Sequence, residues 1–439
     1  MGEQHDAMAA EAVEFCSTLI RIDSTNTGDP ATTGDGESRC VEYVQSLLAE
    51  FGLEGQLLEK APGRGNLVVR MKGSDPEAPA LLVHGHTDVV PANVADWTVD
   101  PFSGEVKDGF VWGRGAVDMK DMVAMTVAAV RQLRRENFVP QRDIVFAFVA
   151  DEEIAGEFGA QFLVDEHPGL FHGVTEAIGE IGGFSLQLRD ELRLYLLGVA
   201  EKGVAWATLT AHGTTGHGSI VPNESNAVAR LSSALGRISE HKWPVVQSAS
   251  LSALVEQLGE ALGRPLDSER LDDELASLGL LAAMLLPGLR TSAVPTQFHA
   301  GYKTNVVPGT ATATVDCRIA PGTDDEFKEQ FMELLGPGIE VSWEEGRSLE
   351  SPARGTLLDA MQAAITAVDP GGKALPFVMS GATDAKAFSQ LGIHCYGFSP
   401  LRLPEGFDFA GMFHGIDERV PVTAIHAGTR ILHRFLSAQ

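Results

Sequence analysis

Apolar strand patterns and amphipathic helix patterns alternate along the first 197 residues of this chain, and the alternation resumes at residue 350. The run DIVFAFVA (143–150) is almost uniformly apolar, as is typical of a strand buried on both faces of a sheet. An alternation of this kind predicts an α/β sheet flanked by helices. The pattern predicts helices at 8–22, 37–52 and 121–136, and strands at 66–71, 80–90 and 143–150.

The segment between residues 198 and 349 has a different order of elements. It reads strand–helix–strand–strand–helix–strand, which is the plan of a ferredoxin-like α+β unit. The expected elements are strands at 203–212, 296–304, 310–319 and 339–345 and helices at 223–240 and 324–335, with a Leu/Ala-rich helical stretch at 245–295. Since 439 residues exceed one ordinary domain, we predict one domain in two pieces, 1–197 and 350–439, with a second domain, 198–349, inserted between them.

Charge and cysteine content limit the partners and the compartment. The 33 basic and 60 acidic residues give a formal charge of −27, which repels phosphate backbones and anionic lipid, so neither nucleic acid nor a membrane is expected as a partner. The four cysteines are scattered without a CxxC pair, which favours a reduced, cytoplasmic setting. No basic region precedes an apolar run at the N-terminus, and the longest nearly apolar run, 275–286, is too short to span a bilayer.

The motif LLVHGHTDVVP (81–91) is the first that indicates chemistry. On a strand, His86 and Asp88 face the same side, so the carboxylate can orient the imidazole as carboxylates do beside metal-bound histidines. The alternative is a set of histidines with satisfied hydrogen bonds at the end of a sheet, and this is the interpretation we adopt for His84.

The motif GRGAVDMKD (113–121) contains GxG but has Asp118 where a dinucleotide fingerprint needs its third glycine. As a glycine-permitted turn, it delivers Asp118 to the head of the helix predicted at 121–136. The alternative is that Asp118 only caps that helix.

Acidic residues and one histidine complete the set. Glu152 and Glu153 follow the apolar strand 143–150, and their side chains diverge, so one can coordinate a metal while the other reaches a water. Two adjacent carboxylates repel unless they share a cation or a proton. The alternative for this pair is a solvated loop. Glu180 (AIGEIGG) and His414 (FHGIDERVPV) lie next to glycines further along the chain.

In this order, the five motifs resemble the co-catalytic zinc peptidase family that contains aminoacylases, succinyl-diaminopimelate desuccinylase, acetylornithine deacetylase, carnosinase and glutamate carboxypeptidases. The resemblance covers nearly the whole chain and implies a zinc-peptidase-type mixed sheet flanked by helices. It implies that Asp88 orients His86 and that Glu152 is the general base. The implied ligand groups are His86, Asp118 and Glu180 on one metal, and Asp118, Glu153 and His414 on the other, with Asp118 bridging.

The inserted segment also resembles the family, as a lid and dimerisation domain. GTTGHGSIVPNESNA supplies His217, which by resemblance stabilises the oxyanion, commonly across a dimer interface. The implied substrate contacts are Asn305, Arg318, Gly381 and Thr383, with Asp384 beside them. The chain departs from the family pattern at Asp121, usually glycine, and at Lys386, usually arginine; the lysine loses a bidentate contact to a carboxylate.

The resemblance implies a dinuclear metallohydrolase for small substrates with a free carboxylate. Zn²⁺ suits the imidazole and carboxylate ligands best, and Co²⁺ or Mn²⁺ also fits. We rank an N-acyl-amino-acid deacylase ahead of a dipeptidase or carboxypeptidase, and we expect a homodimer in which His217 completes the partner's site. The alternative of another class is an inactive metal-binding scaffold, against which the retained base Glu152 argues. A nucleotide-binding protein ranks last, because no phosphate loop is present.

Overall fold

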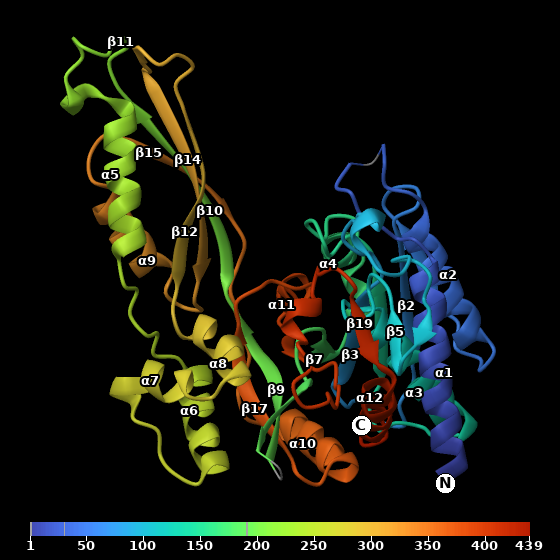
Figure 1. The fold of residues 1–439 in the computed structure, drawn as a ribbon. Coiled ribbons are helices and arrows are strands. Elements are labelled where there is room, and N and C mark those ends of the chain that lie inside the picture. The colour runs from blue at the N-terminus through green and yellow to red at the C-terminus, as the bar shows by residue number, and fades with distance from the viewer. Residues whose placement is uncertain (1, 30, 190–191) are drawn as a thin grey trace.

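The computed structural model describes residues 2–29, 31–189 and 192–439. Within these residues the chain forms a ten-stranded mixed sheet and a separate four-stranded sheet, which stand side by side in Figure 1. The larger sheet has the order β1-β2-β6-β3-β7-β18-β9-β16, with β17 and β8 also paired to β9. The predicted mixed α/β fold is therefore confirmed.

The centre of the larger sheet is parallel. β6 (Ile144–Val149), β3 (Ala80–His86), β7 (Val174–Gly179) and β18 (His394–Gly397) run side by side in the same direction. Every residue of β3 and β6 is buried, because helices cover both faces. The outer strands are β1 (Gln56–Glu59), β2 (Gly65–Met71), β8 (Ser185–Arg189), β9 (Leu192–Glu201), β16 (Leu349–Glu350) and β17 (Gly372–Met379).

Two separate cores cover the two faces of this sheet. Phe146 and Phe148 of β6 pack in one core with helices α1 (Gly2–Arg21), α3 (Lys120–Arg135) and α12 (Val422–Leu436), whereas Val145 and Ala147 pack in the other with α4 (Ala160–Glu166) and α11 (Ala385–Ser389). Adjacent residues of a strand point to opposite faces, so a uniformly apolar strand supplies both cores. The remaining elements here are α2 (Gly36–Ala49), α10 (Thr356–Val368) and the small sheet of β4 (Val106–Lys107), β5 (Phe110–Trp112) and β19 (Arg419–Pro421).

The smaller sheet and its two helices form what we call the α+β unit. Its elements follow the predicted order, namely β10 (Gly203–His212), α5 (Ala227–Glu240), β12 (Ser292–Ala300), β14 (Thr310–Ile319), α9 (Asp324–Leu335) and β15 (Ile339–Glu345). Its sheet order, β12-β14-β10-β15, is that of a ferredoxin-like unit. Leu231 of α5 and Phe331 of α9 pack on Leu209 of β10, while Trp206 on the opposite face is 44% exposed. The antiparallel pair of β11 (Gly216–His217) and β13 (Val306–Val307) extends this unit.

The 245–295 stretch packs differently from the expectation that it enlarges the inserted domain. Its helices α6 (Ala249–Leu262), α7 (Leu271–Ala276) and α8 (Leu280–Leu285) place Leu254, Leu258 and Leu285 in the core of the larger sheet, where α6 contacts β17. The covered face of the α+β unit is already occupied by α5 and α9. The stretch therefore returns the chain to the larger sheet, and the domain boundaries at 197/198 and 349/350 stay predictions.

Local chemistry explains the shifted element ends. β3 ends at His86 rather than near residue 90, because the chain turns to pair Val89 with Thr25. α5 begins at Ala227, since the Asn226 side chain caps it by accepting from the backbone N–H of Val228 and Ala229. No helix in the described part of the chain is both long enough and apolar enough to cross a bilayer.

Candidate metal centre

The proposed ligands gather where three neighbouring parallel strands end. His86 is the last residue of β3, Glu153 lies shortly after the end of β6, and Glu180 directly follows β7. In open α/β sheets, ligands bind at the carboxyl ends of the strands, where side chains from separate segments converge. Sheet order thus brings together residues that are up to 94 positions apart in the sequence (180 minus 86).

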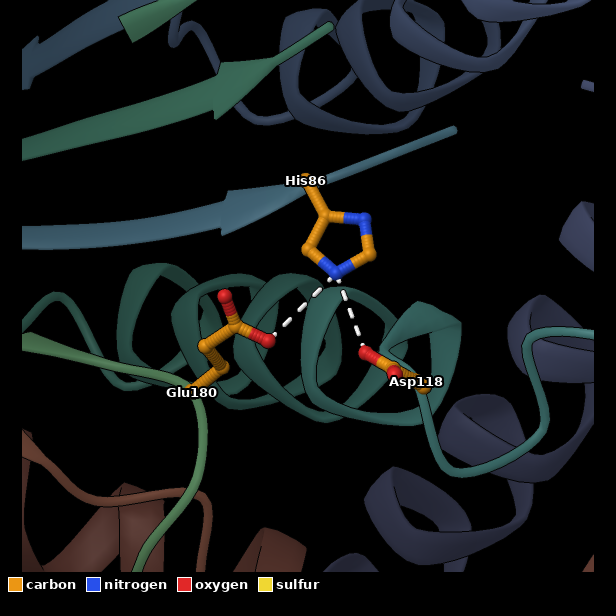
Figure 2. Close-up of side chains that lie close together, drawn as sticks. All are labelled: His86, Asp118 and Glu180. Atoms are coloured by element: carbon orange, nitrogen blue, oxygen red, sulfur yellow. Dashed lines mark hydrogen bonds and ion pairs between the residues drawn. The ribbon is translucent and has the colours of Figure 1, made fainter. Parts of the chain in front are cut away.

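The first group of donors consists of His86, Asp118 and Glu180. Nε2 of His86 lies 3.1 Å from Oδ1 of Asp118 and 3.4 Å from Oε2 of Glu180 (Figure 2). Nδ1 of His86 lies 3.0 Å from the carbonyl oxygen of Asp88, which can only accept, so Nδ1 carries a proton. In the neutral imidazole, the free lone pair is then on Nε2, the atom that faces the two carboxylates.

The second group consists of Asp118, Glu153 and His414. Nε2 of His414 lies 3.1 Å from Oε2 of Glu153 and 3.4 Å from Oδ2 of Asp118. His414 sits in a loop with a left-handed φ of 55°, and its side chain is 56% exposed. The two oxygens of Asp118 therefore face different histidines, which is the arrangement that a bridging carboxylate requires.

The donor chemistry of both groups fits divalent cations. Within each group, one ligand atom per residue lies within 4.8 Å of the others. Among the described residues, Oε1 of Glu153 and Oε1 of Glu180 are buried without a hydrogen-bond partner, and burial raises the pKa of Glu180 to about 7. Buried carboxylates in this number need compensating positive charge, which two cations would supply. Two imidazoles and three carboxylates are ordinary ligands for zinc and similar metals.

A buried glutamate holds the loop that carries Asp118. Glu418 accepts hydrogen bonds from the backbone N–H of Gly115 at 3.1 Å and of Val117 at 2.8 Å, and Nη1 of Arg114 lies 2.7 Å from it. The N-terminus of α3 has no side-chain cap, so the interpretation of Asp118 as a helix cap is wrong. Glu418 also belongs to the segment that follows His414, so one carboxylate links the loops of two ligands.

Asp88 acts mainly on the loop after β6 and less on His86. Its Oδ1 accepts from the backbone N–H of Glu152 and its Oδ2 from that of Glu153, both at 3.1 Å, while Oδ1 lies 3.5 Å from Nδ1 of His86. Asp88 lies beyond the end of β3 and not on the strand as expected, but its carboxylate still faces the ring of His86, so its orienting role stays a prediction. Burial, together with the charge of Glu180, raises the pKa of Glu152 well above its ordinary value.

The expected substrate contacts on the C-terminal loop are already engaged within the chain. Thr383 donates its backbone N–H at 3.1 Å and its hydroxyl at 2.6 Å to the buried Glu201, and Lys386 donates to the carbonyl oxygen of Lys202 at 2.7 Å. Arg318 forms a two-point ion pair with Asp316, at 2.9 and 3.1 Å. Glu201, the last residue of β9, and Lys202, which follows it, were missed because no motif or spacing distinguishes them.

A cavity of about 430 Å³ opens beside Glu152. Two of its walls are the segment 382–390, which includes α11, and the segment Glu345–Arg347, which leads from the α+β unit to β16. Its charged lining residues include Glu152, Arg347, Asp384 and Lys386. The volume is within the range of small-ligand sites.

His217 and Asn305 lie together, but apart from the metal centre. They lie at the β11–β13 strand pair, where the Gly218 N–H donates to the carbonyl oxygen of Asn305 at 3.2 Å, and both are exposed. Figure 1 places β11 at the end of the α+β unit farthest from β9, well away from β3 and β7. Within one chain, the structure therefore does not bring these two residues to the ligand groups.

Comparison with known proteins identifies the family. A sequence model of peptidase family M20/M25/M40 matches residues 82–438, so the chain belongs to this family, and the match includes all five proposed ligands. Two curated relatives are similar over most of their length. The N-fatty-acyl-amino acid synthase/hydrolase PM20D1 of Bos taurus is 27% identical, with 90% of this chain and 81% of the relative covered. Aminoacylase-1 of Sus scrofa is 28% identical, with 91% and 89% covered.

Solved structures agree with the fold. An M20 family metallo-carboxypeptidase from Sulfolobus solfataricus superposes with a TM-score of 0.71 at 17% identity, covering 98% of this chain and 99% of that one. A dinuclear metal-binding M20 peptidase of Bacillus subtilis gives 0.60 at 14%, covering 98% of each. The protein is thus a metallohydrolase of amide or peptide bonds, and the family together with the two donor groups supports a pair of divalent metals.

Proposed function

We propose that this protein is a dizinc hydrolase that removes the acyl group from N-acyl amino acids. The observation that carries the proposal is the pair of donor groups that share Asp118, with Glu152 held beside them by Asp88. In this proposal the metals are bound by His86, Asp118 and Glu180 and by Asp118, Glu153 and His414. Zn²⁺ is the assigned ion because imidazole and carboxylate ligands suit it, and Co²⁺ or Mn²⁺ would fit the same donors.

Glu152 is the general base of the proposed reaction. Two divalent cations at the centre supply Lewis acidity, which polarises the scissile carbonyl and acidifies water. Glu152 takes one proton as water adds to the carbonyl carbon, and it returns that proton to the amide nitrogen as the C–N bond breaks. The products are a carboxylic acid and a free amine.

A free carboxylate on the substrate is the proposed recognition element. Lys386 lines the cavity beside Glu152, and Arg318 is the cation named by the family resemblance. Because Asp316 holds Arg318 in an ion pair, a substrate carboxylate must share or displace that partner. Gly381, Thr383 and Asn305 remain proposed contacts, with Thr383 acting after rearrangement of its bonds to Glu201.

The names of the relatives favour deacylation over peptide cleavage. Both curated relatives quoted above are named for N-acyl-amino-acid chemistry. A dipeptidase or carboxypeptidase is the second candidate, favoured by the similar fold of the metallo-carboxypeptidase. An inactive scaffold is a poorer explanation, because a structural site would not need a half-buried glutamate beside the ligands.

We further propose a cytoplasmic homodimer in which His217 of one chain donates to the oxyanion in the site of the other. The separation of His217 from the ligand groups within one chain supports this arrangement. All four cysteines are buried and free, as a reducing compartment requires.

The test is the release of free amine from a panel of N-acyl amino acids and dipeptides by zinc-loaded protein, with Glu152→Gln as the matched control. We expect N-acyl amino acids to be cleaved with the highest kcat/KM. The same compounds with the free carboxylate converted to a carboxamide should be cleaved poorly. Faster cleavage of dipeptides would replace the deacylase assignment with the peptidase one. A loaded wild-type protein that is no faster than Glu152→Gln on every substrate would contradict the proposed function.

A further inference from the structure

The short segment between α1 and α2 lies directly against the segments that follow β3 and β6. Thr25 pairs with Val89, and the Asn26 backbone N–H donates to the carbonyl oxygen of Val89 at 2.9 Å. Asn26 is 1% exposed. This segment precedes residues 82–438, so the family match says nothing about it.

The side-chain amide of Asn26 joins two buried carboxylates. Its Nδ2 donates to Oδ2 of Asp88 at 3.0 Å and to Oδ1 of Asp151 at 2.9 Å, which uses both hydrogens of the NH₂ group. Its Oδ1 accepts from the Gly28 N–H at 3.1 Å. The orientation of the amide is therefore determined, since the nitrogen must face the two acceptors and the oxygen the one donor.

Arg64 supplies the positive charge beside Asp151, the second carboxylate that Asn26 contacts. Its guanidinium is buried, lies 2.9 Å from Glu37 and pairs with Oδ1 of Asp151. The Asp151 N–H donates to Glu37 at 3.1 Å, so the carboxylate of Glu37 also holds the backbone here. Without Arg64 and Asn26, Asp88 and Asp151 would be two buried negative charges with no shared partner between them.

The chain of contacts ends on the backbone that carries Glu152 and Glu153. Asp88 accepts from the N–H groups of both residues. Asp151, which precedes them, has a left-handed φ of 67°, a conformation that a non-glycine residue holds only where the surroundings impose it. The Phe158 N–H donates to Oδ2 of Asp151 at 3.1 Å, so the loop is also tied from its far side.

We propose that Asn26 and Arg64 are positioning residues that set the loop 151–153, and with it Glu152, relative to the metal ligands. The proposal rests on the proposed role of Glu152 for its effect on rate. Neither residue lines the cavity beside Glu152, so they act through Asp88 and Asp151 and not on the substrate.

An isosteric substitution of Asn26 distinguishes a role in positioning the loop from a role in filling space. Asn26→Asp keeps the shape and the acceptor for Gly28 but removes both donated hydrogen bonds and adds a fourth carboxylate to Glu37, Asp88 and Asp151. Asn26→Ala removes the bonds without adding charge. We expect kcat to fall about 10–100-fold in Asn26→Ala, as is usual for residues that support a metal site, and further in Asn26→Asp, with KM within about 2-fold of wild type.

Asn93 offers a matched control on the surface. Its Nδ2 also donates to a carboxylate, that of Asp96 at 2.9 Å, and its Oδ1 accepts from the N–H two residues on, at 3.3 Å. Asn93→Asp should leave kcat and KM unchanged. For Arg64, Arg64→Lys should recover part of the kcat lost in Arg64→Met, because it restores the charge beside Asp151 but not both contacts.

Hydrogen exchange tests the same proposal without a substrate. In metal-loaded wild type, the amides of Glu152 and Glu153 are protected by Asp88; in both Asn26 variants they should exchange at least about 10-fold faster, while the amides of α3 keep their rates. If Asn26→Asp keeps near-wild-type kcat and exchange rates while Asn26→Ala is impaired, Asn26 only fills space. If the exchange rates are unchanged in both variants, the proposal is overturned. If wild type cleaves no substrate, the proposed function fails while the exchange result still decides the role of Asn26.

Discussion

The carboxyl-end edge of the larger sheet and the far end of the α+β unit are built in opposite ways. At the sheet edge, most of the groups around the metal ligands are buried and tied by several hydrogen bonds, such as Glu418 to the loop of Asp118. At the far end, His217 is exposed, and within the described part of the chain its side chain forms hydrogen bonds only with Ser219, two residues on. A site built at the sheet edge can bind metal within one chain, whereas His217 can serve it only from a second chain or after movement. Substitutions at the sheet edge should therefore lower metal binding, kcat or both. Substitutions of His217 at the far end should lower kcat without loss of metal.

The largest effect is expected from Glu152→Gln. General base catalysis contributes about 10²–10⁴-fold, so kcat should fall by this factor while the two metals stay bound. Glu153→Ala, which removes a ligand, should lose metal as well as activity. Metal analysis after dialysis, read beside kcat, checks both. Loss of metal in Glu152→Gln would show that the two glutamates have exchanged roles.

His217→Ala should reduce kcat by about 10²–10³-fold, the effect of deleting one oxyanion donor, without loss of metal. The pair of variants then tests where His217 acts. When His217→Ala and Glu152→Gln are mixed under conditions that exchange subunits, one site of a mixed dimer carries both defects and the other neither, so activity should partly return. Confirmed exchange without any return of activity would place His217 in its own chain's site.

The sequence located the metal centre better than the residues that support it. Glu152 and Glu153 drew attention because two adjacent carboxylates follow an apolar strand, whereas Glu180 and His414 were assigned only through the family resemblance. The structure shows that Glu153 and Glu180 meet because neighbouring parallel strands end at one edge. Asn26 and Glu201 carry no such signal. Asn26 is a single polar residue whose partner Asp151 is 125 positions away, so only tertiary structure reveals the contact.

The fold was predicted to a similar extent. The order of elements in the α+β unit follows from period and turn signals, and the structure has the same order. The packing of 245–295 could not be predicted from the sequence. Leu254 and Leu258 show that one helix face is apolar, but they do not show which of the cores that face packs into. The expected strand position of Asp88 was wrong for a related reason, because β3 ends two residues earlier, at His86. Its role in orienting His86 stays a prediction, and its Oδ1 lies 3.5 Å from Nδ1 of that histidine.

Metal binding should release protons, because His414 is protonated in the metal-free chain. The hydrogen bonds that its ring donates to the carboxylates of Asp118 and Glu153 raise its pKa to about 10, so at pH 8 a cation must displace this proton. Affinity should rise with pH up to about 10. In the metal-free chain the same charged contact stabilises the fold fully below the unfolded pKa of about 6.5 and is lost as pH rises through about 10. Calorimetry in buffers of different ionisation enthalpy measures the released protons, and a heat that is independent of the buffer would contradict the prediction.

The smallest effect is expected at Asn226, which belongs to the same sequence motif as His217 but has a structural role. Its side chain accepts from the N–H of Val228 at 2.9 Å and of Ala229 at 3.4 Å, and so caps α5. Asn226→Ala should lower the free energy of unfolding by about 1 kcal/mol, and Asn226→Asp, which still accepts both bonds, should lower it by less. Because α5 packs on the smaller sheet and not on the larger one, both variants should bind two metals as wild type does. Denaturant titration followed by metal analysis checks this, and metal loss in Asn226→Ala would mean that the two regions are coupled more tightly than their separate cores indicate.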